Sequence, residues 1–270
     1  MTRHSVQAAA VCALLALSGC IDSSTKITVK PDGSGTVEKT IVLSRHLAEL
    51  MKQMGNTSDA ATIERGMLNE AGLKAGASQM GAEVSFVSAE KVTSPKGNGY
   101  KVLYRFKDIA KVKLNQNPAA DLTMPSTGAA GAADSTQEYL TFKFVKGTPA
   151  VLTIVAPKIK ASGSSQAAAP AASSADTDKM MASFKPLYSD MRIALSVEVE
   201  GKITQTNAAY ASGSTVTLLD MDFAKILADD AMLKKLSGGQ SKSMTEVKDM
   251  VKSLPGVVID TQDAVSISFR

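Results

Sequence analysis

Hydrophobic residues alternate with polar ones along several short stretches of the chain. The longest alternation lies at 191–199, where Met191, Ile193, Leu195, Val197 and Val199 occupy every second position. Successive side chains of a strand point to opposite faces, so this spacing is typical of a strand with one buried face. Further strands are predicted for the sequences KITQTN, STVTLLDMD, GVVIDT and AVSISFR.

Three pairs of such stretches are separated by turn sequences and predict hairpins. In the first, TKITVK and GTVEKTIVLS flank PDGSG, where Pro31, Asp32 and Gly33 supply the turn and Gly35 is expected to adopt a positive φ. In the second, the strand that follows SPKGNG is expected to bury Tyr100, Val102, Tyr104 and Phe106. The third pairs QEYLTFKFV with AVLTIVA across KGTP. Three successive hairpins favour a mostly antiparallel sheet.

Other segments repeat their apolar residues every three to four positions, which predicts about five amphipathic helices. The fold class predicted from the sequence is therefore α+β, a mostly antiparallel sheet of hairpins with these helices packed on it. The first two expected helices have apolar faces of Leu47, Leu50, Met51 and Met54, after a cap at Ser44, and of Ile63, Met67, Leu68 and Ala71, ending at Gly72. A third is expected over 177–187. The last two have apolar faces of Phe223, Ile226, Leu227 and Ala231, after a cap at Asp222, and of Met244, Val247, Met250, Val251 and Leu254, ending at Pro255 and Gly256.

Two stretches interrupt this periodic pattern. Residues 115–136 and 161–176 are rich in Ala, Gly, Ser and Pro. Such sequences bury too little apolar area to offset the entropy lost on ordering, so we interpret both as low-complexity loops. Residues 20–270 are then predicted to form a single domain that carries these two loops.

The N-terminus has the pattern of an export signal. Arg3 and His4 form a short polar region, and the apolar run at 6–17 is too short to cross a bilayer. The sequence Leu17-Ser18-Gly19-Cys20 that follows resembles the lipobox of bacterial lipoproteins. That resemblance implies that residues 1–19 are a signal peptide and that Cys20 becomes the first mature residue, its sulfur carrying a diacylglyceryl group. The alternative is an ordinary signal peptide with an incidental cysteine.

The distribution of cysteines favours the lipid anchor. Cys12, the only other cysteine, lies within the predicted signal, so the mature chain keeps no thiol with which Cys20 could pair. Acyl chains on Cys20 would hold the protein to the membrane on the extracytoplasmic side of the cell envelope. If the cell has two membranes, the outer membrane is favoured, because Ile21 stands where an Asp would resemble an inner-membrane retention signal, although Asp22 follows it.

A second resemblance concerns the folded part of the chain. ITVKPDGSGTVEKTIVLS and VEVEGKITQTNAAYASGSTVTLLDMD, with turns at Gly201 and Asn207 and apolar Val216 and Leu218, resemble the bracketing segments of the LppM-like lipoprotein domain family over 20–220. The resemblance implies one α+β domain whose first and last strands share a sheet. It also implies an envelope protein that cradles a hydrophobic or lipid ligand between sheet and helices. It supplies no catalytic residue.

Candidate catalytic and metal-binding residues are few. His46 is the only histidine of the predicted mature chain and is interpreted as a surface or capping residue of a helix, and SSTK at 23–26 is discounted as a Ser-Lys motif because it directly follows the anchor. The acidic group Asp220, Asp222, Asp229 and Asp230 is interpreted as a helix cap and a solvated helix face. The formal net charge of +4 is mild and no basic run alternates with aromatics, so no nucleic-acid partner is expected. We predict no catalytic residue, cofactor or metal.

Three hypotheses for the function remain open. The chain is a non-enzymatic, lipid-anchored envelope protein that binds a hydrophobic or lipid ligand, or a structural or assembly partner of other envelope proteins, or an unrecognised envelope enzyme. An enclosed apolar cavity would favour the first hypothesis, and an exposed apolar patch on a solid core the second. Buried carboxylates that converge in a cleft would favour the third.

The lipid anchor gives the first testable prediction. Replacing Cys20 by Ser removes the sulfur that carries the acyl chain, so the C20S protein should lose both palmitate labelling and membrane fractionation. Labelled palmitate fed to cells, followed by fractionation, measures both. Equal labelling and partitioning of C20S and the parent protein would contradict the lipobox interpretation.

Overall fold

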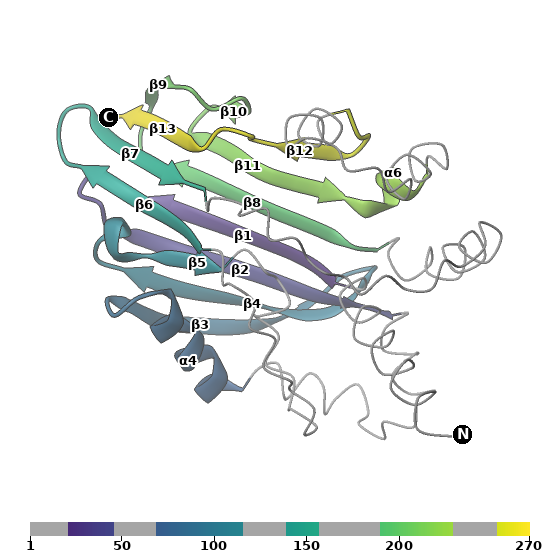
Figure 1. The fold of residues 1–270 in the computed structure, drawn as a ribbon. Coiled ribbons are helices and arrows are strands. Elements are labelled where there is room, and N and C mark those ends of the chain that lie inside the picture. Colours follow the sequence, from purple (N-terminus) through teal and green to yellow (C-terminus); the bar gives the residue numbers. More distant parts are fainter. Residues whose placement is uncertain (1–20, 46–68, 116–138, 157–189, 229–252) are drawn as a thin grey trace, which may run out of the picture.

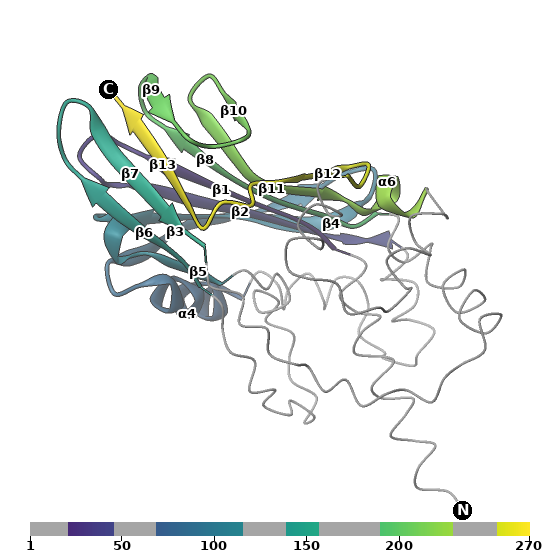
Figure 2. The same ribbon diagram turned by 45° about the horizontal axis from the view of Figure 1, so that its top comes forward.

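The computed structural model describes residues 21–45, 69–115, 139–156, 190–228 and 253–270, and this part of the chain is mostly β. Strands hold 58% of these residues and form two sheets that pack face to face (Figure 1, Figure 2). The predicted α+β class with about five helices is therefore wrong. In the described residues only two α-helices are present, and the second sheet covers the large sheet where helices were expected.

The large sheet has eight strands in the order β10-β11-β8-β1-β2-β4-β3, and β12 pairs with β11 beside this path. The central strand β1 runs parallel to β8 and antiparallel to β2. The strands are β1 (Ile21–Val29), β2 (Gly35–Ser44), β3 (Val84–Thr93), β4 (Gly97–Phe106), β8 (Arg192–Val199), β10 (Ala211–Ser212), β11 (Thr215–Asp222) and β12 (Val257–Ile259).

The second sheet has five antiparallel strands in the order β5-β6-β7-β13-β9. It lies against the half of the large sheet that contains the β1–β2 turn, while the large sheet continues past it toward the start of β1 (Figure 2). Its strands are β5 (Lys113–Asn115), β6 (Tyr139–Val145), β7 (Ala150–Val155), β9 (Ile203–Thr206) and β13 (Ala264–Phe269).

The three predicted hairpins are confirmed as β1–β2, β3–β4 and β6–β7. They divide between the two sheets, because β6 and β7 join the second sheet while the other two hairpins build the large one. The first and last strands of the stretch that resembles the LppM-like domain, β1 and β11, lie in the same sheet with β8 between them.

The β1–β2 turn shows why its residues are needed. The Asp32 carboxylate accepts hydrogen bonds from the backbone N–H (2.9 Å) and the hydroxyl (2.7 Å) of Ser34. The positive φ predicted for Gly35 is found at Gly33 instead, with φ of 85°. Gly35 lies within β2, where a Cβ would stand 1.9 Å from the carbonyl oxygen of Thr28. Both glycines are therefore required, but for different reasons.

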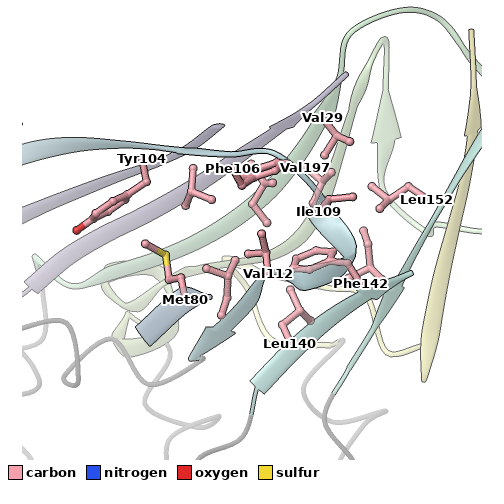
Figure 3. Close-up of a cluster of buried hydrophobic side chains, with 14 of the residues drawn as sticks. Val29, Met80, Tyr104, Phe106, Ile109, Val112, Leu140, Phe142, Leu152 and Val197 are labelled. Carbon is pink, nitrogen blue, oxygen red and sulfur yellow. The ribbon is translucent and has the colours of Figure 1, made fainter. Parts of the chain in front are cut away.

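The hydrophobic core lies between the two sheets. Alternate residues of the large sheet point toward the second sheet, and Leu140 and Phe142 of β6 and Leu152 of β7 point back toward them (Figure 3). Buried side chains of β13 belong to the same core. The predicted inward set of β4 is confirmed, since Tyr100, Val102, Tyr104 and Phe106 are all buried. The fully buried side chains come from both sheets and from the 3-10 turn η2 (Ile109–Lys111), and the largest of them include Ile27, Val29, Val37, Ile41, Val102, Phe106, Ile109, Leu152, Ile154, Ile267 and Phe269.

Helix α4 (Glu70–Met80) packs against β3 and buries Leu73, Ala77 and Met80. Asn69 caps it by accepting from the N–H of Ala71. The predicted helix end at Gly72 is wrong, because α4 begins at Glu70 and contains Gly72 in its first turn. Each glycine in its interior costs about 1 kcal/mol relative to alanine, and the burial of the apolar face compensates for this.

The predicted helix after Asp222 is confirmed over its first residues as the short helix α6 (Phe223–Leu227), while Ala231 lies outside the described residues. Several predicted segments lie outside the described residues. They are the first two predicted helices except Ala71 and Gly72, the helix over 177–187, nearly all of the helix before Pro255, and both low-complexity loops except Asn115. Within the described part, no helix is long and apolar enough to span a bilayer.

Two of the connections between the sheets, β9–β10 and β12–β13, lie beside each other. The side chain of Asn207 in the first connection donates to the carbonyl of Ala264 (3.1 Å) and accepts from the N–H of Ser266 (2.7 Å). Asp260 in the second connection accepts a hydrogen bond from the N–H of Ala209 (2.8 Å). The side-chain amide of Asn207 donates to that of Gln262, which in turn donates to the backbone carbonyl of Asn207. These bonds fasten the two crossings to each other.

The position of β13 between β7 and β9 makes the C-terminal strand part of the core. Replacing Val265 (3% exposed) by Ala should lower the free energy of unfolding by about 2 kcal/mol, since burial of its methyl groups is lost and a cavity forms. The same substitution at Val87 (40% exposed) should change it by less than about 0.5 kcal/mol. Urea denaturation measures both values, and equal effects would contradict the described packing of β13.

Candidate functional site

The inner face of the large sheet changes character along its strands. Near the β1–β2 turn, cross-strand neighbours on this face are apolar: Val29 lies beside Val199, and Ile27 lies between Val37 and Val197. All of these side chains are at most 1% exposed, and they pack in the core against the second sheet. This half of the face therefore stabilises the packing of the two sheets.

Closer to the start of β1, the inner face carries polar side chains among apolar ones. In the register of the sheet, Thr25 lies between Lys39 and Leu195, and Ser23 lies between Ile41 and Ile193. Ile41 in turn pairs with Tyr100 of β4. We call this region the N-proximal face, and define it as Ser23, Thr25, Lys39, Ile41, Tyr100, Ile193 and Leu195.

Four side chains of the N-proximal face are buried, and Thr25, Ile193 and Leu195 are half-buried. Ser23 and Lys39 are each 7% exposed, Ile41 is 1% exposed and Tyr100 is 3% exposed. A buried ammonium group loses hydration and therefore requires polar or charged neighbours. Ser23 and Lys39, with Ser44, are the buried polar side chains among the described residues, and two of the three lie on this face.

This combination of groups suits an amphipathic molecule. The half-buried aliphatic side chains Ile193 and Leu195 offer van der Waals contact to hydrocarbon, while the hydroxyl of the half-buried Thr25 offers a hydrogen bond to a polar head. Ligand sites are typically apolar with a small number of placed polar groups. The N-proximal face is therefore the candidate functional site.

The large hydrophobic side chains exposed in the described part of the chain are Val87, Val145 and Tyr210, which stand on three different segments and form no common patch. The buried polar side chains there include no carboxylate.

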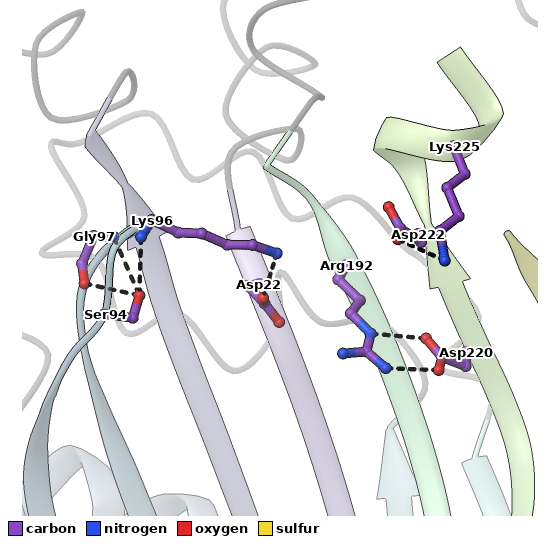
Figure 4. A network of polar contacts seen from close by, with 8 residues as sticks. All are labelled: Asp22, Ser94, Lys96, Gly97, Arg192, Asp220, Asp222 and Lys225. Carbon is purple, nitrogen blue, oxygen red and sulfur yellow. Dashed lines mark hydrogen bonds and ion pairs between the residues drawn. The ribbon is translucent and has the colours of Figure 1, made fainter. Parts of the chain in front are cut away.

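A polar network lies on the opposite, outer face of the large sheet at the same end (Figure 4). Arg192 forms a bidentate ion pair with Asp220, in which Nε lies 2.9 Å from Oδ1 and Nη2 lies 2.7 Å from Oδ2. Lys96 of the β3–β4 turn pairs with Asp22 at 3.0 Å, and Lys225 pairs with Asp222 at 3.5 Å. Each carboxylate is therefore matched with a cation from a neighbouring element or turn.

This network explains the acidic group seen in the sequence. Asp222 occupies the N-cap position of α6 as predicted, but its side chain makes no capping hydrogen bond and pairs with Lys225 instead. Asp220 is engaged by Arg192, and Asp229 and Asp230 lie outside the described residues. The part of the chain that the structure describes contains no cluster of three ligands that could hold a metal ion.

The remaining candidates from the sequence, Cys20 and His46, also lie outside the described residues. Sequence reasoning missed Lys39 altogether. The signal was present in GTVEKTIVLS, where Lys39 stands between Val37 and Ile41 at alternate positions and so shares their inward face. The predicted strand pattern therefore already implied a lysine on the buried side.

Comparisons with known proteins give one structural similarity. The sequence matches no protein-family profile and no curated protein. One solved structure, the NMR structure of the folded domain of LppM from Mycobacterium tuberculosis, aligns over 93% of this chain and 90% of its own, with 13% identity and a TM-score of 0.32. It bears the family name to which the sequence motifs point, but similarity at this level establishes neither a shared fold nor a shared function.

The Arg192–Asp220 pair gives a pH prediction. Hydrogen bonds from Arg192 lower the pKa of Asp220, against the opposing effect of partial burial. A carboxyl group whose pKa is lower in the folded state stabilises the fold above its unfolded pKa, and that stability is lost as the pH falls through the folded value. D220N should therefore cost about 1 kcal/mol or less at pH 7, and the difference from the parent should shrink as the pH falls below the ordinary aspartate pKa of about 3.9. Thermal unfolding from pH 7 to 2.5 measures this, and a difference that persists undiminished at the acid end would contradict the ion-pair account.

Proposed function

We propose that this chain is a lipid-anchored protein of the bacterial cell envelope, held on the extracytoplasmic side of a membrane by acyl chains on Cys20. It binds a hydrophobic or lipid ligand at the N-proximal face and acts by binding rather than by catalysis. In a cell with two membranes, the proposed location is the outer membrane.

The observation that carries this proposal is the position of β1. The strand begins at Ile21, directly after Cys20, and Ser23 and Thr25 of the N-proximal face are among its first residues. At about 3.3 Å per residue, Ser23 lies roughly 10 Å of chain from the lipidated sulfur. A protein anchored in this way holds the N-proximal face close to the bilayer surface, where lipids and other amphiphiles are concentrated. The predicted cleavage before Cys20 removes none of β1, so the described fold is compatible with a mature chain that begins there.

The chemistry of the face supports an amphipathic ligand. Along β1 the inward residues change from Ile27 and Val29 at the turn to Ser23 and Thr25 near the anchor. A ligand bound here would place its hydrocarbon part toward the apolar core and its polar part toward the hydroxyl groups.

The ligand proposal is tested by native mass spectrometry of mature protein purified from its own host. Co-purifying lipid is expected in the parent protein. Thr25→Trp fills the N-proximal face and should reduce the bound lipid, because the indole occupies the space that the ligand needs.

Thr40→Trp is the matched control, since Thr40 of β2 is directly opposite Ser24 on the outer face and is also half-buried. It should leave lipid binding unchanged. The thermal unfolding of both variants is measured to confirm that each is folded. A parent protein that carries no lipid, or equal loss in the two variants, would contradict the proposed site.

A further inference from the structure

The two sheets differ in their charged residues. The five strands of the second sheet contain no aspartate and no glutamate. The strands of the large sheet, in contrast, carry six: Asp22, Glu38, Glu90, Glu198, Asp220 and Asp222. The face of the second sheet that points away from the core is therefore a surface of a different kind.

The register of the strands places the side chains of this surface in rows. Val145 lies opposite Val151, and Val151 lies beside Ser268. In the next row, Thr153 lies between Lys143 and Ser266. In the third, Thr141 lies between Lys113 and Val155. All these side chains are exposed or half-buried. We define the basic face as Lys113, Tyr139, Thr141, Lys143, Val145, Val151, Thr153, Val155, Ser266 and Ser268.

The lysines of the basic face are not neutralised by carboxylates. In the described part of the chain Lys143 has no ion pair, and the Lys113 ammonium lies 4.9 Å from the ring centre of Tyr139. On the outer face of the large sheet the lysines are paired instead, Lys26 with Glu198 at 2.5 Å and Lys101 with Glu90 at 2.6 Å. Among the described residues, the two lysines of the basic face therefore lack the carboxylate partners that Lys26 and Lys101 have on the large sheet.

The basic face also exposes apolar surface. Val145, at the end of β6, is 65% exposed, the highest value among the exposed large hydrophobic side chains of the described residues. Lys146 follows it in the turn to β7. The nearby carboxylates stand in connections beside the face. Asp32 lies near Lys146 and accepts from Ser34, and Asp260 and Asp263 precede β13.

We propose that the basic face is a docking surface for a bilayer that contains anionic lipids. Lysines near a membrane surface are attracted by its negative potential, and exposed apolar side chains add contact with the interface. A sheet face with lysines, valines and hydroxyl groups, and without carboxylates, is complementary to such a surface. The choice of a bilayer over a soluble anion depends on Val145, and on the proposed lipid anchor, which keeps a membrane within reach.

The test is sedimentation with vesicles of phosphatidylcholine containing 30% phosphatidylglycerol, using the mature chain with Cys20→Ser so that no acyl chain contributes. This chain should bind these vesicles, and binding should weaken as salt increases. It should not bind vesicles of phosphatidylcholine alone. The double variant K113Q/K143Q should bind about tenfold more weakly, because two cations near the surface are removed.

A matched control separates the basic face from net charge. K26Q/K101Q removes the same charge from the large sheet and should weaken binding by less than about threefold, since screened charges far from the surface contribute little. Val145→Ser should also weaken vesicle binding while leaving binding to a soluble polyanion, polyphosphate, unchanged. K113Q/K143Q should keep the lipid that co-purifies with the mature protein, which distinguishes this surface from the ligand site of the proposed function.

Several results would overturn the proposal. They are an absence of binding to anionic vesicles at low salt, equal weakening by the two lysine pairs, and binding to polyphosphate with no binding to vesicles. Capture of an acidic protein by the basic face in the absence of vesicle binding would assign the surface to a protein partner instead. Because the assay uses a chain without a lipid, its failure would leave the test of Cys20 lipidation unaffected.

Discussion

The burial of one face of each sheet against the other is the interaction on which this fold depends. The core contains Ile27 and Val37 from the large sheet and Leu152 and Phe269 from the second, all at most 1% exposed. Segments from both ends of the chain contribute, because β1 is central in one sheet and β13 is internal in the other. Asn207 and Asp260 fasten two of the connections between the sheets, β9–β10 and β12–β13, to each other. The proposed ligand site and the basic face both follow from this packing: one is the part of the large sheet beyond the second sheet, and the other is the uncovered side of the second sheet.

Strands were predictable from the sequence because their alternation is local. The spacing of Val197 and Val199 defines a buried face whichever neighbour the strand acquires, and β8 formed as expected. The division into two sheets was not predictable, since alternation does not state which strands pair. The expectation of a sheet covered by helices was wrong for that reason: the apolar face of the large sheet is covered by β6, β7 and β13. Helix α4 was mispredicted at Gly72 because tertiary burial of Leu73 and Met80 outweighed the low helix propensity of glycine.

The candidate site was only partly predictable. Cys20 follows from a short motif, whereas the N-proximal face requires the register that places Thr25 beside both Lys39 and Leu195. The pairing of Asp220 with Arg192 likewise joins residues 28 positions apart, and a run of acidic residues in the sequence does not reveal it. The absence of carboxylates from the strands of the second sheet is visible in the sequence, but it acquires meaning only once those strands are known to share one surface.

Native-state hydrogen exchange tests the central claim most directly, namely that the two sheets form one cooperative core. The account predicts that amides of β1, β2, β4, β7, β8 and β13 in the interiors of both sheets exchange only by global unfolding, with the same free energy and the same denaturant dependence. If the amides of β7 and β13 exchanged through a separate opening at a clearly lower free energy than those of β1 and β2, the sheets would be independent units. The account of a shared core would then be wrong.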